Sequence, residues 1–316
     1  MSSRQDAPSS AQLLRATLLV VVSACCFGSI SPLTVIATEH GMALESIQAW
    51  RYFTSALLLV ALGWWRARAP RRELPKTDMA PWWSPALLLK AGGGQATVAT
   101  FALVGLRWLP AATVSFLFYT FPAWVAVITA VRGIERLDRI RVSALMLSLG
   151  GIGVMVGAPS ATSLNPWGVA AALTAALVYA LYIPMIGSLQ RGRDAIDVSR
   201  AIAVGGTVVF VIWAAATGTL FRLPTTAAWG ASALQGLLSA VSFLSFLAGL
   251  RVLGPVRAAI TSTVEPFWTT LLGVVLLRQS VGTGTLIGGL AIMGAVLLLQ
   301  RPPVAHRPAQ SSAADT

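Results

Sequence analysis

The chain alternates between long apolar stretches and short polar segments. A bilayer core about 30 Å thick needs about 20 predominantly apolar residues to form one spanning helix, and ten stretches approach or meet that length. The pattern therefore predicts ten transmembrane helices. They cover residues 13–38, 46–65, 86–106, 111–131, 140–157, 167–189, 198–217, 228–250, 256–277 and 282–299.

The composition strengthens this prediction. Over 316 residues, 56% are hydrophobic and only 11% are charged, and the mean hydropathy is +0.74, which is too apolar for a soluble domain. We expect an all-α membrane protein with disordered tails at 1–12 and 300–316, which are rich in small and polar residues. Cys25 and Cys26 are adjacent within an apolar stretch, so they indicate neither a disulfide framework nor a metal site. No cofactor is expected.

The formal net charge of +12 is explained by membrane topology. If the N-terminus is cytoplasmic, all but four of the 23 Lys and Arg residues lie in tails or connections on the cytoplasmic side. The positive-inside rule then predicts that both termini are cytoplasmic, and no nucleic-acid partner is needed to explain the charge. The four residues assigned to the outside are Arg51, Arg107, Arg222 and Arg278.

The sequence repeats itself weakly. A shift of 144 residues places Gly105 on Gly249 and Pro122 on Pro266, and a shift of 152 places Pro32 on Pro184. This predicts two five-helix repeats, 13–157 and 158–299. Because five is odd, the second repeat enters the membrane from the opposite side. Inverted repeats are typical of transporters that work by alternating access, although channels also contain them.

Glu265 is the one acid in the middle of a long apolar stretch. A charged residue there costs roughly 2.5 to 3.5 kcal/mol on insertion scales, so a functional role is the first hypothesis. Helical spacing places Thr261, Glu265 and Trp268 on one face, and Phe121 holds the equivalent position in the first repeat. Two interpretations stay open. Glu265 either carries a proton or binds a cationic group of the substrate, or it is a structural residue hydrogen-bonded to hydroxyls or to backbone freed by Pro266.

Other polar and aromatic residues in the predicted helices together suggest a cavity for a small organic molecule, although each alone is better explained by packing or lipid contact. Three glycines, 92–94, precede Gln95 and indicate either close helix packing or an opening in which Gln95 contacts a substrate. Prolines in matching places of the two repeats are candidate hinges, and glycines of the fifth and tenth helices form either internal contacts or a possible homodimer. The candidate cavity residues are Gln95, Ser115, Tyr119, Tyr179, Tyr182, Gln235, Ser239, Glu265 and Trp268, and the candidate hinges are Pro32, Pro122, Pro184 and Pro266.

No pattern indicates an enzyme. His40 and His306 are expected in a loop and a tail, and the chain lacks GxSxG, HExxH and phosphate-binding glycine motifs. Without a nucleotide-binding motif, the energy for transport would come from an ion gradient or from the substrate gradient.

Several short motifs resemble the drug/metabolite transporter superfamily, specifically its EamA-type ten-helix members. They are 106–112 (LRWLPAA), 119–122 (YTFP) and 133–137 (GIERL) in the first half, and 250–253 (LRVL) and 264–267 (VEPF) in the second. In that family each half ends its fourth helix with a Gly-Glu pair. Here the first half has Gly133 and Glu135, but the second has Arg278 and Gln279, so this acid is missing from the second copy.

The resemblance implies a multi-pass inner-membrane carrier of small metabolites, with a cavity between helices three, four, eight and nine and with mobile helices one and six. It places Gln95, Ser115, Tyr119, Gln235 and Glu265 near that cavity. The resulting hypothesis is a secondary transporter of amino acids or related compounds, with export favoured and with Glu265 as a candidate for proton coupling. Its partners would be the small-molecule substrate and the lipid bilayer. The alternatives are an uncoupled facilitator or channel, and a membrane scaffold or sensor.

Overall fold

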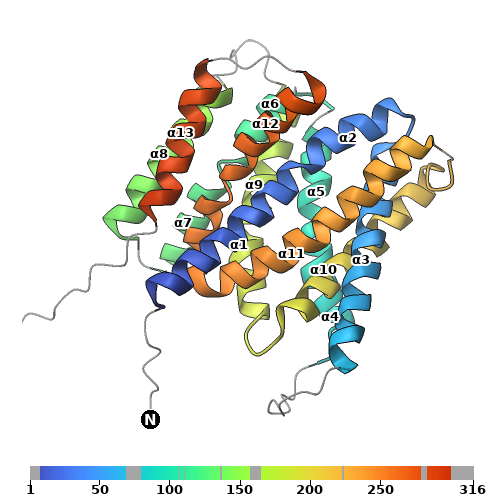
Figure 1. The fold of residues 1–316 in the computed structure, drawn as a ribbon, viewed down its shortest axis with the longest axis horizontal. Helices are drawn as coiled ribbons and strands as arrows, with labels where there is room; N and C mark the ends of the chain where they lie inside the picture. The colour runs from blue at the N-terminus through green and yellow to red at the C-terminus, as the bar shows by residue number, and fades with distance from the viewer. Residues whose placement is uncertain are drawn as a thin grey trace, which may run out of the picture.

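The computed structural model describes residues 8–68, 80–105, 107–109, 111–135, 137–156, 165–222, 224–278 and 283–299 (Figure 1). All regular structure in these ranges is helical. The helices are α1 (Ser10–Gly28), α2 (Ile30–Glu39), α3 (Leu44–Arg68), α4 (Pro85–Leu87), the π-helix η1 (Leu88–Gly93), α5 (Gly94–Gly105), α6 (Ala111–Phe118), α7 (Phe121–Val131), α8 (Arg139–Val156), α9 (Pro166–Leu189), α10 (Ala195–Ala216), α11 (Thr226–Thr261), α12 (Val264–Leu277) and α13 (Thr283–Leu298).

Within the described residues these helices cross the molecule ten times, as predicted. Four passes are built from consecutive pieces: α1 with α2, α4 and η1 with α5, α6 with α7, and the last part of α11 with α12. The eighth and ninth passes are merged in α11, which turns at Gly254, where φ is +76°. The chain is an all-α membrane protein of ten transmembrane helices arranged as two inverted five-helix repeats, and the described ends of the chain lie toward the same side (Figure 1).

Helix α1 begins three residues before the predicted span because Ser9 and Gln12 form a capping box. The Gln12 amide donates to Ser9 Oγ at 3.3 Å, and the Ser9 amide donates to Gln12 Oε1 at 2.9 Å. Such reciprocal bonds satisfy two amides that the first helical turn leaves unpaired. Of the predicted tails at 1–12 and 300–316, residues 1–7 and 300–316 lie outside the described residues, and residues 10–12 belong to α1.

The two repeats contact each other through pairs of helices that respect their pseudo-symmetry. Helix α3 packs on its equivalent α10, and α8 packs on its equivalent α13. Helix α1 packs on α11 and α5 packs on α9, so the first and eighth passes form one pair and the third and sixth form the matching pair. Each of these pairs therefore contains one helix from each repeat.

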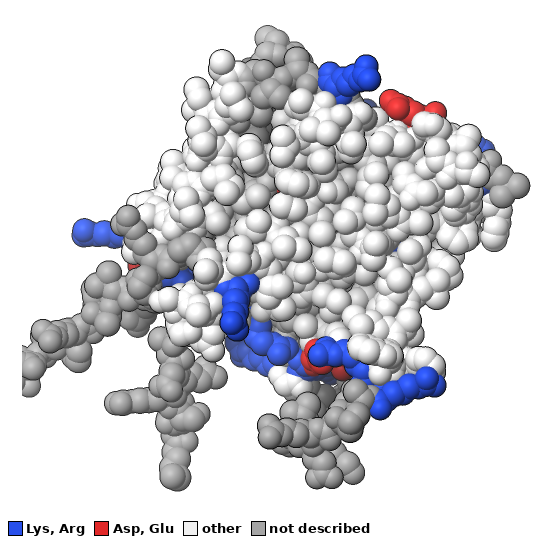
Figure 2. Space-filling model, viewed as in Figure 1, with Lys and Arg blue, Asp and Glu red and all other residues white. Residues whose placement is uncertain are grey.

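The surface is that of a membrane protein. Five helical segments are long and apolar enough to cross a membrane, and three shorter apolar helices accompany them. Figure 2 shows a band without charged residues across the middle of one face, with Lys and Arg mostly gathered along the edge where α1 begins. The five long segments are Ser10–Glu39, Pro85–Gly105, Pro166–Leu189, Ala195–Ala216 and Thr226–Thr261.

Glycines of the fifth and tenth passes lie inside the molecule. A Cβ atom added to Gly151 would lie 2.7 Å from the Gly288 carbonyl oxygen, and one added to Gly284 would lie 2.8 Å from that of Val154. These glycines therefore allow α8 and α13 to pack closely, which favours the internal alternative. The homodimer stays a prediction.

Candidate functional site

A cavity of about 540 Å³ lies among α2, α3, α5 and α6 of the first repeat and reaches α12 of the second. Its wall includes Thr38 and Leu44, which are exposed where α2 meets α3. That end is opposite the described chain termini (Figure 1). The volume suits a small organic molecule.

Glu265 lies at the inner part of this cavity, on the first turn of α12. The predicted continuous helix over 256–277 is broken here, because Pro266 has no amide hydrogen for the bond that would continue the helix. Instead the Glu265 amide donates to the Ser262 carbonyl at 3.0 Å in a tight turn. The break separates Thr261 from Glu265, so these residues do not share one continuous helical face.

Hydroxyl groups satisfy the backbone around this break. Ser262 Oγ donates to the Ala258 carbonyl at 2.8 Å, and Thr263 Oγ1 donates to the Ile260 carbonyl at 2.7 Å. The Glu265 carboxyl is itself a hydrogen-bond partner of the Tyr119 hydroxyl. Tyr119 lies at the matching break between α6 and α7, so the two inverted repeats bring their broken helices together at the acid.

The break between α1 and α2, at Ser29, also contacts α12 close to Glu265. Thr269 Oγ1 donates to the Gly28 carbonyl at 2.9 Å, and Trp268 Nε1 donates to Ser29 Oγ at 3.0 Å. A Cβ atom on Gly28 would lie 2.8 Å from the Glu265 carbonyl oxygen. The absence of a side chain at Gly28 therefore lets the first pass approach the backbone that carries the acid.

Four candidate residues line this cavity: Gln95, Ser115, Tyr119 and Glu265. Gln95 directly follows η1, and π-helical turns are frequent at functional sites. The glycines before it serve the close packing that was one of the two predicted alternatives, since a Cβ on Gly92 would lie 2.4 Å from Gly205 Cα. In this structure close packing and an accessible Gln95 occur together.

Tyr179 and Tyr182 belong to an aromatic cluster that contacts the cavity-lining residues. The Tyr179 ring stacks on Phe118 with centroids 5.5 Å apart and meets Phe121 edge-on at 4.8 Å. The Tyr182 hydroxyl donates to the Ala91 carbonyl at 2.9 Å. These two tyrosines and Gln95 border a much smaller cavity of about 10 Å³.

Three other candidates lie outside the cavity wall. Gln235 is fully buried, and its Nε2 donates to Thr34 Oγ1 at 3.2 Å, so it holds a residue that does line the cavity. Ser239 is 1% exposed and its hydroxyl makes no hydrogen bond to described residues. Trp268 binds Ser29 as described above.

The four candidate hinge prolines fall in different settings. Pro122 and Pro266 lie just after the equivalent breaks of the fourth and ninth passes. Pro32 follows the break between α1 and α2, whereas Pro184 lies inside α9, which is continuous. The first pass is thus broken and its equivalent sixth pass is not. Whether these residues bend during function stays a prediction.

The sequence prediction missed Gln48 and Arg51, which also line the cavity. Arg51 was assigned to the outside by its position near the end of the second apolar stretch. It instead lies within α3 and is only 7% exposed. The available signal was the same one that identified Glu265: a charged residue inside a membrane helix.

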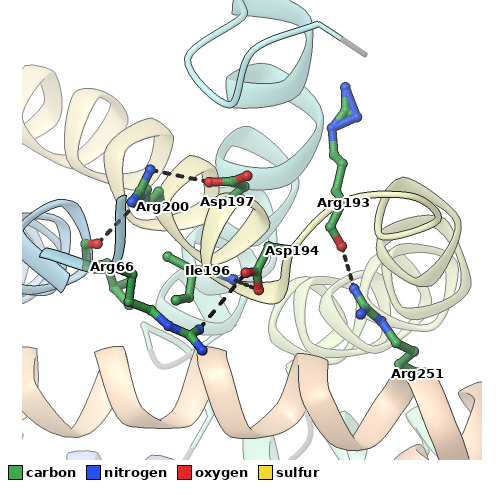
Figure 3. Close-up of polar contacts among 8 residues, drawn as sticks. Arg66, Arg193, Asp194, Ile196, Asp197, Arg200 and Arg251 are labelled. Carbon is green, nitrogen blue, oxygen red and sulfur yellow. Dashed lines mark hydrogen bonds and ion pairs between the residues drawn. The ribbon is translucent and has the colours of Figure 1, made fainter. Parts of the chain in front are cut away.

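At the end where the chain begins, polar contacts join helices beside a second cavity of about 550 Å³, which is lined by Arg66, Asp194 and Arg251. Gln190 Nε2 donates to the Leu247 carbonyl at 3.0 Å, and the Arg251 guanidinium donates to the Arg193 carbonyl, which ties α11 to the connection between α9 and α10 (Figure 3). Nearby, the Arg66 and Asp194 side chains lie 4.0 Å apart. The cavity that contains Glu265 has its exposed wall, at Thr38 and Leu44, at the opposite end.

Comparisons with known proteins agree with this architecture. The model of the EamA-like transporter family matches twice, at residues 14–157 and 166–301. The uncharacterized inner membrane transporter YicL of Salmonella typhimurium (strain LT2) is 28% identical over 231 residues, which are 67% of this chain and 72% of YicL. A protein crystal structure matches 90% of this chain and 97% of its own with a TM-score of 0.76, and its 18% identity supports similarity of fold alone.

Proposed function

The chain belongs to the EamA-like transporter family and is a multi-pass inner-membrane transporter of small solutes; on this premise, we propose that it moves amino acids or related metabolites by alternating access, in the export direction and coupled to protons. The observation that carries this proposal is the position of Glu265. It lies where the broken helices of two inverted repeats meet, at the inner part of a cavity accessible from one end.

Each element of the proposal has a physical basis. Inverted repeats allow two states to be formed by exchanging the conformations of the two halves. An acid inside a membrane protein is stable when it carries a proton or pairs with a cation, and Glu265 can therefore exchange one for the other during the cycle. The aromatic wall formed by Phe27 and Phe118 suits the apolar part of a small metabolite.

The test is transport by the purified protein in liposomes loaded with labelled amino acids and nucleobases, with and without a pH gradient. We expect saturable counterflow of one solute class, accelerated by the gradient. Glu265→Gln should abolish the effect of the gradient, whereas Glu39→Gln, which changes an exposed acid at the end of α2, should leave it unchanged.

The same experiment separates the alternatives. Flux that never saturates and shows no counterflow would indicate a facilitator or channel. If no solute moves, the transport proposal is wrong and a scaffold or sensor is favoured. Gradient-driven flux that survives Glu265→Gln would make this acid structural.

A further inference from the structure

Arg51 is a buried cation without an acidic partner in the cavity. Its side chain lines the cavity, its Nε makes no hydrogen bond, and within the described residues no acid lies within 4.0 Å of it. Its guanidinium carbon lies 4.7 Å from the centroid of the Tyr52 ring. The Tyr52 hydroxyl is also a hydrogen-bond partner of the guanidinium. Both contacts attract the cation, but the neutral tyrosine cancels none of its net charge.

The second repeat provides an internal comparison. A shift of 149 residues places Ile47, Gln48 and Arg51 on Ile196, Asp197 and Arg200. Arg200 Nη1 donates to Asp197 Oδ1 at 3.2 Å, and its Nε donates to the Leu59 carbonyl at 3.2 Å (Figure 3). The same helical position is therefore neutralised by an acid in α10.

In α3 the acid is replaced by the neutral amide Gln48, whose Oε1 makes no hydrogen bond to described residues and which also lines the cavity. Two polar side chains one turn apart thus face the cavity with unused hydrogen-bonding capacity. An unpaired charge inside a membrane protein is costly and by default indicates a functional site.

We propose that Arg51 binds the anionic group of the transported solute, so that the protein selects small carboxylates, amino acids included, over amines and neutral solutes. This inference rests on the proposed function and specifies its substrate class. The planar guanidinium can hold both oxygens of a carboxylate at once. Gln48 can accept a hydrogen bond from a donor on the same solute, and Glu265 remains available at the inner part of the cavity.

The first test measures binding to the purified full-length protein by thermal shift. The probes are a panel of amino acids and small carboxylates, each matched with the amine that lacks the carboxylate, such as leucine with isopentylamine. We expect at least one carboxylate to stabilise the protein and its amine to bind about 10- to 100-fold more weakly, the range for loss of a charge-assisted hydrogen bond. Stabilisation by amines alone, or by none of the probes, would overturn the proposal.

Three variants assign this preference to Arg51. Arg51→Gln should remove the discrimination between acid and amine. Gln48→Asp should do the same by supplying the acid found in the second repeat, in a variant whose buried charge is now paired. Arg222→Gln, which changes an exposed arginine in the connection between α10 and α11, should leave discrimination unchanged. Discrimination that persists in both Gln48→Asp and Arg51→Gln would refute the assignment.

Transport assays keep this inference separate from the proposed function. If carboxylates bind through Arg51 but no gradient drives their flux, the anion site stands and the coupled transporter does not. If amines are transported as well as their parent acids and Arg51→Gln has no effect, the transporter stands and the anion site does not.

Discussion

Glu135, in the connection between α7 and α8, contacts the turn inside α11. In that turn Gly254 adopts a positive φ and Pro255 has no amide hydrogen, so Val256 is the first residue able to donate. The buried Val256 amide donates to Glu135 Oε1 at 3.2 Å. One carboxyl from the connection between α7 and α8 thus caps the start of the ninth pass.

Burial and the neighbouring donors shift the pKa of the Glu135 carboxyl in opposite directions. Burial raises the pKa of its carboxyl, while the Val256 amide, Arg141 at 3.5 Å and Arg257 act to lower that pKa, and burial dominates. Asp138 also faces Arg257 and shares its charge. Since the folded-state pKa lies above the ordinary value of 4.5, stability is greatest when Glu135 is protonated and falls as the pH rises through the raised pKa.

Substitution of Glu135 should separate its hydrogen bond from its charge. Glu135→Ala leaves the Val256 amide without its acceptor and should lower the stability by about 1 to 3 kcal/mol. Glu135→Gln keeps an acceptor and should be far milder. Thermal unfolding in detergent at several pH values would measure both effects.

The pH dependence of the stability tests whether Glu135 takes up a proton in the folded chain. The stability of the natural chain relative to Glu135→Gln should improve as the pH falls from neutral toward the ordinary pKa of 4.5, because only the natural chain gains the proton. A constant difference over this range would show that Glu135 does not titrate there, and equal stability of the Ala variant would show that the cap is unimportant.

At the scale of elements, η1 and α10 are in direct backbone contact. A Cβ on Gly205 would lie 2.5 Å from the Leu88 carbonyl oxygen and 2.9 Å from Gly92 Cα. Both atoms belong to the backbone, so neither can move aside as the end of a flexible side chain could. This contact fixes the π-helical turn directly before Gln95, so we infer that it also fixes where Gln95 enters the cavity.

Gly205→Ala should therefore force η1 and α10 apart and lower stability by about 1 to 3 kcal/mol, the typical cost of overpacking. Gly230→Ala is a matched control in α11, because no atom lies within 4 Å of the added methyl group. It should be neutral or stabilising by up to about 1 kcal/mol. Similar destabilisation of both variants, measured by thermal unfolding, would indicate a general intolerance of alanine.

The ten passes could be predicted from sequence because each requires a long apolar stretch bounded by polar residues. The breaks at Ser29, Thr120 and Thr263 could not, since each lies within an uninterrupted apolar stretch. The prolines that follow them were interpreted as bends. Pro184 occupies the equivalent position in α9 without breaking it, so tertiary packing decides which proline accompanies a break.

The candidate site was predictable to a similar extent. Glu265 is identified by its charge and Gln95 by the unusual glycines before it. Arg51 was missed because the charge count assigned it to the outside, although it lies within the predicted span 46–65. The position of Gln235 behind Thr34 depends on contacts between distant helices. Sequence patterns identify unusual residues, but the orientation of each side chain is set by neighbours far away in the chain.

At the scale of the whole molecule, the proposed alternating access would require two states that differ in which end of the cavity is open. Here the cavity with Glu265 is exposed beside Thr38 and Leu44, while contacts such as Gln190 with Leu247 join helices at the opposite end. With both termini in the cytoplasm, as the basic residues predict, this state faces outward.

Thiol labelling in intact cells can test this orientation. In a chain with Cys25 and Cys26 replaced by alanine, Ser115→Cys should react with a membrane-impermeant reagent added outside, because Ser115 lines the cavity. Ser239→Cys, at a position only 1% exposed, should stay unlabelled. Labelling of Ser115→Cys exclusively from the cytoplasmic side would reverse the predicted topology.

The contrast between Phe121 and Glu265 has a consequence for the origin of the chain. A symmetrical pair of identical five-helix proteins would carry the same residue at both positions, and therefore either two acids near the centre or none. Joining the two units in one gene allows each to change independently. The covalent fusion is thus what permits an acid at position 265 but not at 121, and an arginine paired with an acid at position 200 but not at 51, in an otherwise duplicated architecture.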